Sequence, residues 1–488
     1  MKLTRLTVIG IIAGLAVLQL FIALFNAHLT FTHEEAMWHY IGRNWLRHGM
    51  PPYSGGADNK SPLIFLVFGI SDWLFGVNYW FPRILGTVAE MIGVYYLYKT
   101  AVHPGTNPAK GRDGQYEGLF VLVVYGFSLL WKMSGGKLVS FTETYATTFV
   151  IVSFYHCLRA EKNKHYFISG LLAGIGLAFR FSAIFGIAAI GITCLRRNIK
   201  AVLLFAGGMI SACLVLALLA YAAGIHLSDI IYFGLTDNFG TGSTTDHPFT
   251  YKLESFASNF FESEFVLFYP FVIGYIVLKR KFDPLITWLV FTFIGINLLG
   301  IYARPHFKEL LPALSIMTAI TLAGLVQDYK VSFKALLAIT CICFLPKQIE
   351  PLIGVKNWAL GSFHKINYCY PPQSSEDADK SLGLWIKANT QPADLVYVAG
   401  FGARVQVFSE RISPTIYFNV TQTPSAKQQL SKDLMNRMPV LVAIPAFQNY
   451  HQYVGADIRK VVDDLVHNYY FRDGCRFGYD IYRLKTVK

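Results

Sequence analysis

Charged residues are scarce in this chain: only 15% of its 488 residues are Asp, Glu, Lys or Arg, whereas 53% are hydrophobic. A soluble protein of this length carries about a quarter charged residues, so the composition excludes an ordinary soluble enzyme. It also excludes a disordered chain. Apolar runs such as 6–25 and 201–223 approach the roughly 20 residues that cross the core of a bilayer. The sequence therefore indicates a polytopic helical membrane protein.

Several signatures of other protein classes are missing. The sequence has no Walker-type phosphate loop, no glycine-rich dinucleotide fingerprint and no internal repeat, which argues against ATP-driven transport within this chain. Its seven cysteines show no metal-ligand spacing. Five of them lie in or beside apolar runs, where a thiol behaves as a small hydrophobe. Cys369 and Cys475 fall in the polar C-terminal region, and they could pair if that region is extracytoplasmic.

The net charge of +13 is explained by its placement. Most Lys and Arg residues gather in short polar breaks between apolar runs. Such clusters mark cytoplasmic loops because Lys and Arg resist translocation, so no nucleic-acid partner is expected. The clusters are Lys2 and Arg5; Lys99, Lys110 and Arg112; Arg159, Lys162 and Lys164; Arg196, Arg197 and Lys200; Lys279, Arg280 and Lys281; Lys330 and Lys334.

The apolar runs predict eleven membrane-spanning helices. With the N-terminus in the cytoplasm, as the basic clusters indicate, an odd number places the C-terminal region outside, as in a multi-pass plasma (inner) membrane protein. Two further segments of the first outer loop are predicted to lie at the interface: an amphipathic helix at 34–48, and a short apolar helix at 63–76 that contains Asp72. The predicted spans are about 6–26, 82–100, 117–133, 138–158, 166–180, 182–195, 201–223, 264–278, 285–302, 307–326 and 335–349.

The composition changes after about residue 350. We therefore predict a transmembrane domain over 1–350 and a small extracytoplasmic α/β domain over 351–488. Helix-like stretches in the second domain lie at 377–389, 424–437 and 456–467. Strand-like runs lie at Leu395–Ala399, Val440–Ile444 and Phe477–Leu484.

Two adjacent carboxylates follow the first predicted span. Glu34 and Glu35 at a membrane surface are costly unless they are solvated, paired or used in function. One interpretation makes them the start of the surface helix, with Thr32 as N-cap and Glu35 three residues later as a capping box. The other makes them functional groups at the outer face.

Further ionisable residues are predicted at or near the outer face. Glu143 lies inside the span at 138–158, where it should face a cavity or a partner, and Asp58 lies in the first outer loop. An anionic headgroup would explain why cations gather on this side, although snorkelling to lipid phosphate is the alternative. The cations are Lys60, Arg83, Arg180, Arg304, His306 and Lys308.

The order of these motifs resembles the GT-C glycosyltransferases, in particular the dolichyl-phosphate-mannose protein mannosyltransferases and the bacterial aminoarabinose lipid A transferases. The Asp-Glu-Ala pattern of that family corresponds to Glu34-Glu35-Ala36, its Lys-x-Pro to Lys60-Ser61-Pro62, and its Thr-Asp to Thr142-Glu143. The resemblance extends over about residues 5–350.

Two later elements add to the resemblance. The stretch from Gly170 to Arg180 is similar to a Gly-Leu-x-x-Gly-hydrophobic-Lys element, and Phe307–Pro312 is similar to a Tyr-x-Leu-Pro element. This chain departs from the family in having Glu34 where Asp is usual and Arg180 where Lys is common. Both departures keep the charge but change its reach and geometry.

The resemblance implies an inverting hexosyl- or pentosyltransferase that moves a sugar from a polyprenyl-phosphate donor to a hydroxyl acceptor outside the membrane. Glu34 is then the candidate base, although Glu35 stays open for this role, and Glu143 would position the acceptor or the sugar, or share the proton. Lys60 would lead the cations that stabilise the leaving phosphate. A divalent metal is not required, and the first loop contains no Asp-x-Asp motif.

Two other functions stay open at this level. A transporter or flippase of lipid-linked sugars could use the same cation-lined cavity, but it should show repeated halves, and none is visible. A membrane-anchored scaffold would leave Glu34, Lys60 and Glu143 dispensable. The polar loop at 224–263 is either a lid or acceptor-site element or a plain connection. The sequence names neither the sugar nor the acceptor.

Overall fold

The computed structural model describes residues 4–25, 30–103, 114–132, 138–236, 249–279, 283–299, 302, 304–347, 352, 355, 356, 376–419, 424–446 and 456–485. The chain divides into two compact units. A helical unit comprises Met1–Asn26, Arg83–Leu219 and Asp246–Ile353, and a mixed unit comprises Ala27–Pro82, Ala220–Thr245 and Gly354–Lys488. The predicted domain boundary after residue 350 stays a prediction. The mixed unit contains both the first predicted outer loop and the C-terminal region.

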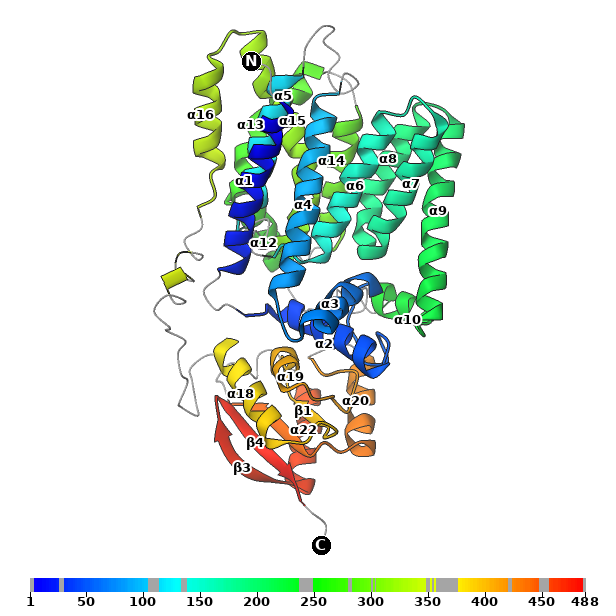
Figure 1. Cartoon of the computed structure of the whole chain (residues 1–488), viewed down its shortest axis with the longest axis vertical. Helices are drawn as coiled ribbons and strands as arrows, with labels where there is room; N and C mark the ends of the chain where they lie inside the picture. The colour runs from blue at the N-terminus through cyan, green and yellow to red at the C-terminus, as the bar shows by residue number, and fades with distance from the viewer. Residues whose placement is uncertain are drawn as a thin grey trace. The chain divides into compact units, whose positions relative to one another are not determined.

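A helix lies over each of the eleven predicted spans (Figure 1). Short 3-10 helices precede three of them: η1 (Phe181–Ala183), η3 (Glu264–Phe268) and η4 (Arg304–Glu309). An amphipathic helix, α12 (Phe249–Phe261), comes before η3. The span helices are α1 (Arg5–Leu24), α4 (Trp80–Ala101), α5 (Gln115–Leu129), α6 (Thr142–Leu158), α7 (Asn163–Phe179), α8 (Ile184–Leu195), α9 (Ile199–Ala222), α13 (Tyr269–Lys279), α14 (Pro284–Leu299), α15 (Leu311–Gln327) and α16 (Phe333–Phe344).

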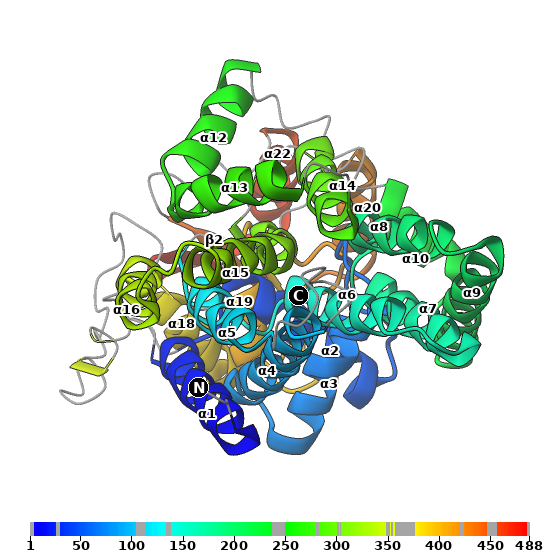
Figure 2. The same cartoon turned by 90° about the horizontal axis from the view of Figure 1, so that it is seen from above.

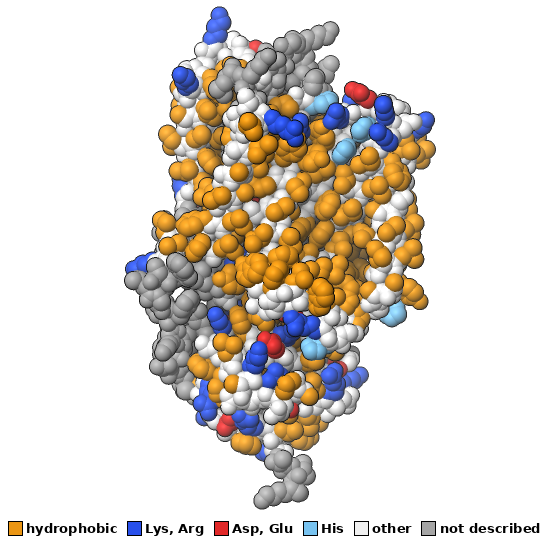
Figure 3. Space-filling view, viewed as in Figure 1, with side chains coloured by type: hydrophobic (Ala, Val, Ile, Leu, Met, Phe, Trp, Pro, Cys, Tyr) orange, Lys and Arg blue, Asp and Glu red, His pale blue; other side chains and the backbone are white. Residues whose placement is uncertain are grey.

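By length and apolar composition, α1 and α9 can each cross a membrane. The residues of α12 and those of η3 with α13 would form a third span if they are taken as one helix bent by 48°. The predicted count of eleven crossings stays a prediction. Hydrophobic side chains cover the visible face of the helical unit, as expected for a surface in lipid (Figure 3).

Glycines set how closely α7 and α9 approach each other. A Cβ added to Gly208 of α9 would lie 2.1 Å from the backbone oxygen of Phe167, and one added to Gly170 of α7 would lie 1.9 Å from that of Phe205. The two backbones therefore touch where neither residue has a side chain. Gly207, the next residue along α9, has no atom within 4 Å of an added Cβ. Figures 1 and 2 both show α7 and α9 side by side.

We expect Gly208→Ala to lower the thermal unfolding temperature of the detergent-purified protein, because the new methyl forces α7 and α9 apart at a cost of about 1–3 kcal/mol. The matched control is Gly207→Ala, which should leave the temperature unchanged or raise it, since Ala is the better helix former. Equal effects from the two variants would contradict the close approach described here.

The mixed unit contains a four-stranded sheet in the order β1-β2-β4-β3. β1 (Val396–Val398) pairs parallel with β2 (Leu441–Pro445), while β4 (Tyr479–Leu484) pairs antiparallel with both β2 and β3 (Tyr470–Arg476). The three predicted helices are confirmed as α18 (Glu376–Asn389), α20 (Pro424–Asn436) and α22 (Ala456–Tyr469). The three predicted strands are confirmed as β1, β2 and β4. Helix α19 (Ala403–Ser409) and strand β3 were not predicted.

Both predicted interfacial segments form helices in the mixed unit, α2 (His33–His48) and α3 (Pro62–Phe75). They cross at Gly42 and Gly69, and a Cβ on Gly42 would lie 2.3 Å from the backbone oxygen of Phe65. The unit also contains two short helical segments of the loop after α9, namely α10 (Leu227–Ile231) and the π-helical η2 (Tyr232–Thr236). Of the polar loop predicted at 224–263, residues 237–248 lie outside the described residues, and residues 249–261 form helix α12.

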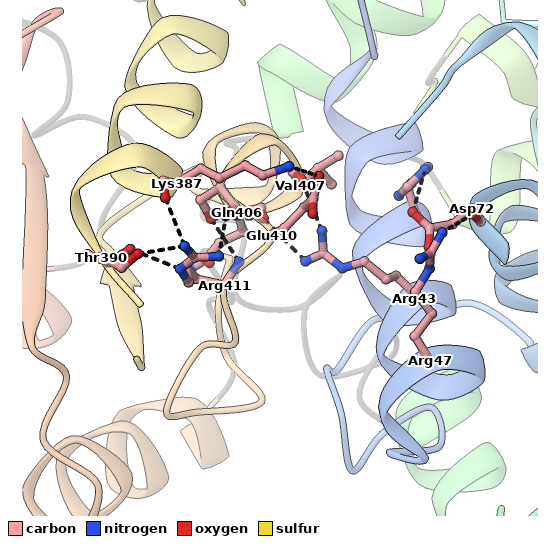
Figure 4. Close-up of polar contacts among 11 residues, drawn as sticks. Arg43, Arg47, Asp72, Lys387, Thr390, Gln406, Val407, Glu410 and Arg411 are labelled. Carbon is pink, nitrogen blue, oxygen red and sulfur yellow. Dashed lines mark hydrogen bonds and ion pairs between the residues drawn. The ribbon is translucent and has the colours of Figure 1, made fainter. Parts of the chain in front are cut away.

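Arginine side chains join the segments of the mixed unit. Arg43 of α2 donates to the backbone oxygens of Val407 (3.0 Å) and Gln406 (3.3 Å) near the end of α19 (Figure 4). Arg411 donates in the same way to the oxygens of Lys387 and Thr390 at the end of α18. A guanidinium that donates to the carbonyls at a helix C-terminus complements the helix dipole. Helix α2 is therefore attached to the α/β part of this unit.

Candidate functional site

The two predicted carboxylates at the start of α2 have different surroundings. The Glu35 side chain is fully buried and accepts from the backbone N–H of Thr32 (2.9 Å), while Thr32 Oγ1 accepts from the N–H of Glu35 (3.2 Å). This is the capping box that the sequence indicated. The side chain of Glu34 keeps an exposed surface and takes no part in the box. Of the two, Glu34 is therefore the carboxylate that can meet a substrate.

Desolvation by the residues packed around Glu34 raises its pKa above the usual 4.5, although part of its surface stays exposed. The nearby carboxylates of Glu35 and Asp58 act in the same direction, whereas the charge of Lys60 lowers this pKa. A carboxylate with a raised pKa is a stronger base than an ordinary surface glutamate.

The loop that contains Lys60 is held next to α2 by side-chain hydrogen bonds. Asp58 Oδ2 accepts from Trp38 Nε1 of α2 (2.9 Å), and Asp58 Oδ1 accepts from the N–H of Asn59 (2.7 Å). Lys60 Nζ donates to Asn59 Oδ1 (2.5 Å), and Tyr53 Oη donates to the Lys60 oxygen (2.6 Å). Among the described residues, no carboxylate lies within ion-pair distance of Lys60. Its charge is therefore available to an anion.

A second polar cluster lies within the helical unit. Arg180, between α7 and η1, forms ion pairs with Glu143 of α6 (2.7 Å) and with Glu309 of η4 (2.8 Å). Ser182 also donates to Glu309 (2.8 Å), and His306 Nε2 lies 3.6 Å from the carboxylate of Glu143. The structure thus brings together three of the predicted site residues, Glu143, Arg180 and His306, and the two carboxylates compensate the charge of Arg180.

Lys308 extends the same cluster. Its Nζ, with a side chain only 1% exposed, lies 2.6 Å from Oε1 of Glu90 in α4 and 2.9 Å from Oγ1 of Thr144 in α6. It also donates to the backbone oxygen of Leu138 (3.3 Å). The Glu90 side chain is 2% exposed. The two side chains therefore neutralise each other in an apolar interior, where either charge alone would be costly.

The other two predicted cations in this unit are Arg83 and Arg304. Arg83 is fully buried and donates to the backbone oxygen of Ala23 near the end of α1 (2.8 Å). The side chain of Arg304 is exposed, and within the described part of the chain it forms no ion pair.

Two members of the buried cluster, Glu90 and Glu309, were not among the predicted site residues. The rule that singled out Glu143, namely that an ionisable group inside a span needs a partner, also applies to Glu90 within the predicted span 82–100. Glu309 was quoted only as part of the motif Phe307–Pro312. Each partner comes from a segment distant in sequence, so the pairs themselves could not be predicted from one chain.

One prediction cannot be compared with the structure, because Cys369, which was considered as a partner of Cys475, lies outside the described residues. Among the residues that are described, no three His, Cys, Asp or Glu side chains gather in a way that could hold a metal ion. The prediction that no metal is required stays a prediction.

The chain was compared with known proteins at the levels of sequence and structure. No protein-family model matches the sequence, and no curated protein matches it either. Among solved structures it is similar to ArnT from Cupriavidus metallidurans bound to undecaprenyl phosphate, with a TM-score of 0.60, 12% identity and 99% of each chain covered. It is also similar to the archaeal oligosaccharyltransferase AglB from Archaeoglobus fulgidus, with a TM-score of 0.52 and 12% identity over 98% of this chain and 74% of that one.

These likenesses confirm the predicted fold. The chain has the GT-C fold and is a helical membrane protein with a small C-terminal sheet. At 12% identity the match establishes the fold and leaves the reaction to be argued from this chain's own residues.

Removing one member of the buried pair between Lys308 and Glu90 should destabilise the protein strongly. We expect Lys308→Met to lower the unfolding free energy by about 3 kcal/mol or more, because it leaves the Glu90 carboxylate buried without its cation. The double variant Lys308→Met/Glu90→Leu should recover much of that loss. Thermal unfolding in detergent measures both, and additive losses would contradict the pairing.

Proposed function

We propose that this protein is an integral-membrane glycosyltransferase that takes a sugar from a polyprenyl monophosphate and inverts the configuration at the anomeric carbon. The observation that carries the proposal is the likeness over 99% of both chains to ArnT, whose structure holds undecaprenyl phosphate. The motif positions that suggested this family supply the groups the reaction needs, a base and a phosphate-binding cation. The donor is thus a polyprenyl-phosphate sugar, and the acceptor is a hydroxyl of a protein, lipid or glycan.

Glu34 is the proposed base. It is the carboxylate at the start of α2 that keeps an exposed surface, since Glu35 is used in the capping box. Its raised pKa favours proton uptake from an acceptor hydroxyl. By contrast, the carboxylate of Glu143 is already held in an ion pair with Arg180. We assign to Glu143 the holding of acceptor or sugar.

Lys60 is the proposed cation for the leaving phosphate. Arg180 and Lys308 each have a carboxylate partner, which weakens the field they offer to another anion. Lys60 has none within the described residues, and its loop is fixed through Asp58 and Tyr53. Such a preorganised cation stabilises negative charge as it develops. The contributions predicted for Arg83, Arg304 and His306 stay predictions.

In the proposed step the acceptor oxygen forms a bond to the anomeric carbon from the face opposite the phosphate. The bond from that carbon to the phosphate oxygen breaks, and the polyprenyl phosphate leaves with the electron pair. The acceptor proton passes to Glu34. The step needs no oxidant, no reductant and no nucleotide.

We expect Glu34→Gln to lower the transfer rate by about 10²–10⁴-fold, the usual contribution of a positioned base. Lys60→Ala should lower it by at least about 10²-fold, because the leaving phosphate loses its cation. Transfer of radiolabelled sugar from polyprenyl-phosphate donors in membranes measures both.

Matched controls come from the exposed ion pair between Lys387 and Glu410, 2.6 Å apart on the α/β part of the mixed unit. Glu410→Gln and Lys387→Ala make the same chemical changes at a surface contact and should transfer sugar at the wild-type rate. A wild-type rate in Glu34→Gln would contradict its role as the base.

The pH profile follows from the direction of the Glu34 shift. The base works only when ionised, so kcat/KM should fall as the pH drops through the pKa of Glu34. Because that pKa is raised, the acid limb should lie above the value of 4.5 for an ordinary glutamate. Glu34→Gln should abolish this limb in whatever activity it retains. An unchanged limb in that variant would assign the titration to another group.

Metal removal tests the cation assignment. If Lys60 rather than a divalent ion stabilises the leaving phosphate, transfer should continue at the same rate after dialysis against EDTA. Lys60→Ala should keep its lowered rate whether or not Mg²⁺ or Mn²⁺ is added. Loss of activity in EDTA with recovery on adding back a divalent ion would show a metal requirement.

A further inference from the structure

Asn419 makes two contacts with the turn of α2 that contains Glu34. Its amide nitrogen Nδ2 lies 2.9 Å from His33 Nε2 and 3.1 Å from Met37 Sδ. These residues flank Glu34, one position before it and three positions after it. The Asn419 side chain is only 9% exposed. One amide from the C-terminal region therefore holds both sides of the first turn of α2.

The protonation state of His33 is compatible with this hydrogen bond. Burial, followed by the charge of Arg404, lowers the pKa of His33 to about 3, so its ring is neutral at working pH. A neutral imidazole has one nitrogen that can accept a hydrogen bond, and Nε2 faces the donor Nδ2 of Asn419. The two N–H groups of the amide thus match two acceptors on α2, the imidazole nitrogen and the weaker thioether sulfur.

The segment that ends at Asn419 lies along α2 and the loop after it. The N–H of Ser413 donates to Tyr40 Oη (2.8 Å), and the ring of Phe418 lies 4.1 Å from that of Tyr40 between centroids. The N–H of Ala57, three residues before Lys60, donates to the backbone oxygen of Ile416 (2.9 Å). Residues 413–419, here called the docking segment, thus contact both sequence stretches that supply the proposed base and phosphate cation.

We propose that Asn419 is a positioning residue for Glu34, so that the docking segment of the α/β region sets the geometry of the proposed base. The proposal rests on the proposed function for the role of Glu34. A base must lie within hydrogen-bond reach of the proton it takes, and a displacement of about 1 Å can cost about 10²-fold in rate. The effect of Asn419 on the reaction passes through residues 33–37, because its amide donates to His33 and Met37 on either side of Glu34.

The test compares two Asn419 variants with a control in the same segment. Asn419→Leu and Asn419→Asp keep the size of the side chain but lack the two N–H donors. Thr415→Val removes a partly buried hydrogen bond to Asp433 (2.7 Å) and the acceptor of the Tyr417 N–H (3.1 Å), both within the C-terminal region, and leaves the Asn419 amide in place. This control reproduces a loss of stability in the docking segment and leaves the hydrogen bonds from Asn419 to His33 and Met37 in place.

Two measurements are made on the full-length protein in detergent. Hydrogen–deuterium exchange of a peptide that covers residues 33–37 should be faster in both Asn419 variants than in wild type, and unchanged in Thr415→Val. In sugar transfer, Asn419→Leu should lower kcat about tenfold and leave the donor KM within about twofold. Combined with Glu34→Gln, Asn419→Leu should cause no further loss, because its effect acts through Glu34.

The outcomes separate this proposal from the proposed function. Unchanged exchange at residues 33–37 in Asn419→Leu overturns the proposal, whatever the activity. Faster exchange with a wild-type kcat, in an enzyme that Glu34→Gln inactivates, also overturns it. Wild-type transfer by Glu34→Gln instead overturns the assignment of the base, while the exchange measurement still reports whether Asn419 holds the turn.

Discussion

Charge compensation in an apolar interior is the constraint on which the structure depends. A buried charge without a partner costs several kcal/mol, so each ionisable group within the helical unit requires a group of opposite sign or hydrogen-bonding partners. Arg180 meets this requirement with Glu143 and Glu309, and Lys308 meets it with Glu90. The chain can therefore contain ionisable side chains inside segments that otherwise read as membrane helices.

The same constraint separates the two groups of predicted site residues. In the helical unit, Arg180 and Lys308 form ion pairs with buried carboxylates. In the mixed unit Glu34 keeps an exposed surface, and Lys60 has no carboxylate partner among the described residues. A reaction that moves a proton and releases a phosphate needs one available carboxylate and one available cation. The attachment of α2 to the α/β region by Arg43, Tyr40 and Asn419 gives that region a direct effect on where the carboxylate lies.

Much of the fold could be predicted from the sequence, because apolar runs and alternating patterns are local signals. Every predicted span coincides with a helix, and the capping box at Thr32 is present. Strand β3 was missed because its residues Arg472, Asp473 and Gly474 break the alternation, and α19 because it is only seven residues long. The pairs between Lys308 and Glu90 and between Asn419 and His33 join residues more than 200 positions apart, so no local pattern predicts them.

The central claim is that the chain transfers a sugar from a polyprenyl monophosphate with inversion. The most direct measurement incubates the purified protein in liposomes with a doubly labelled polyprenyl-phosphate sugar and acceptor, and follows both products by mass spectrometry and NMR. The account predicts one free polyprenyl monophosphate for each sugar transferred, with the opposite anomeric configuration in the product. Movement of the intact lipid-linked sugar between leaflets without release of polyprenyl phosphate would contradict it, and so would a product that retains the donor configuration.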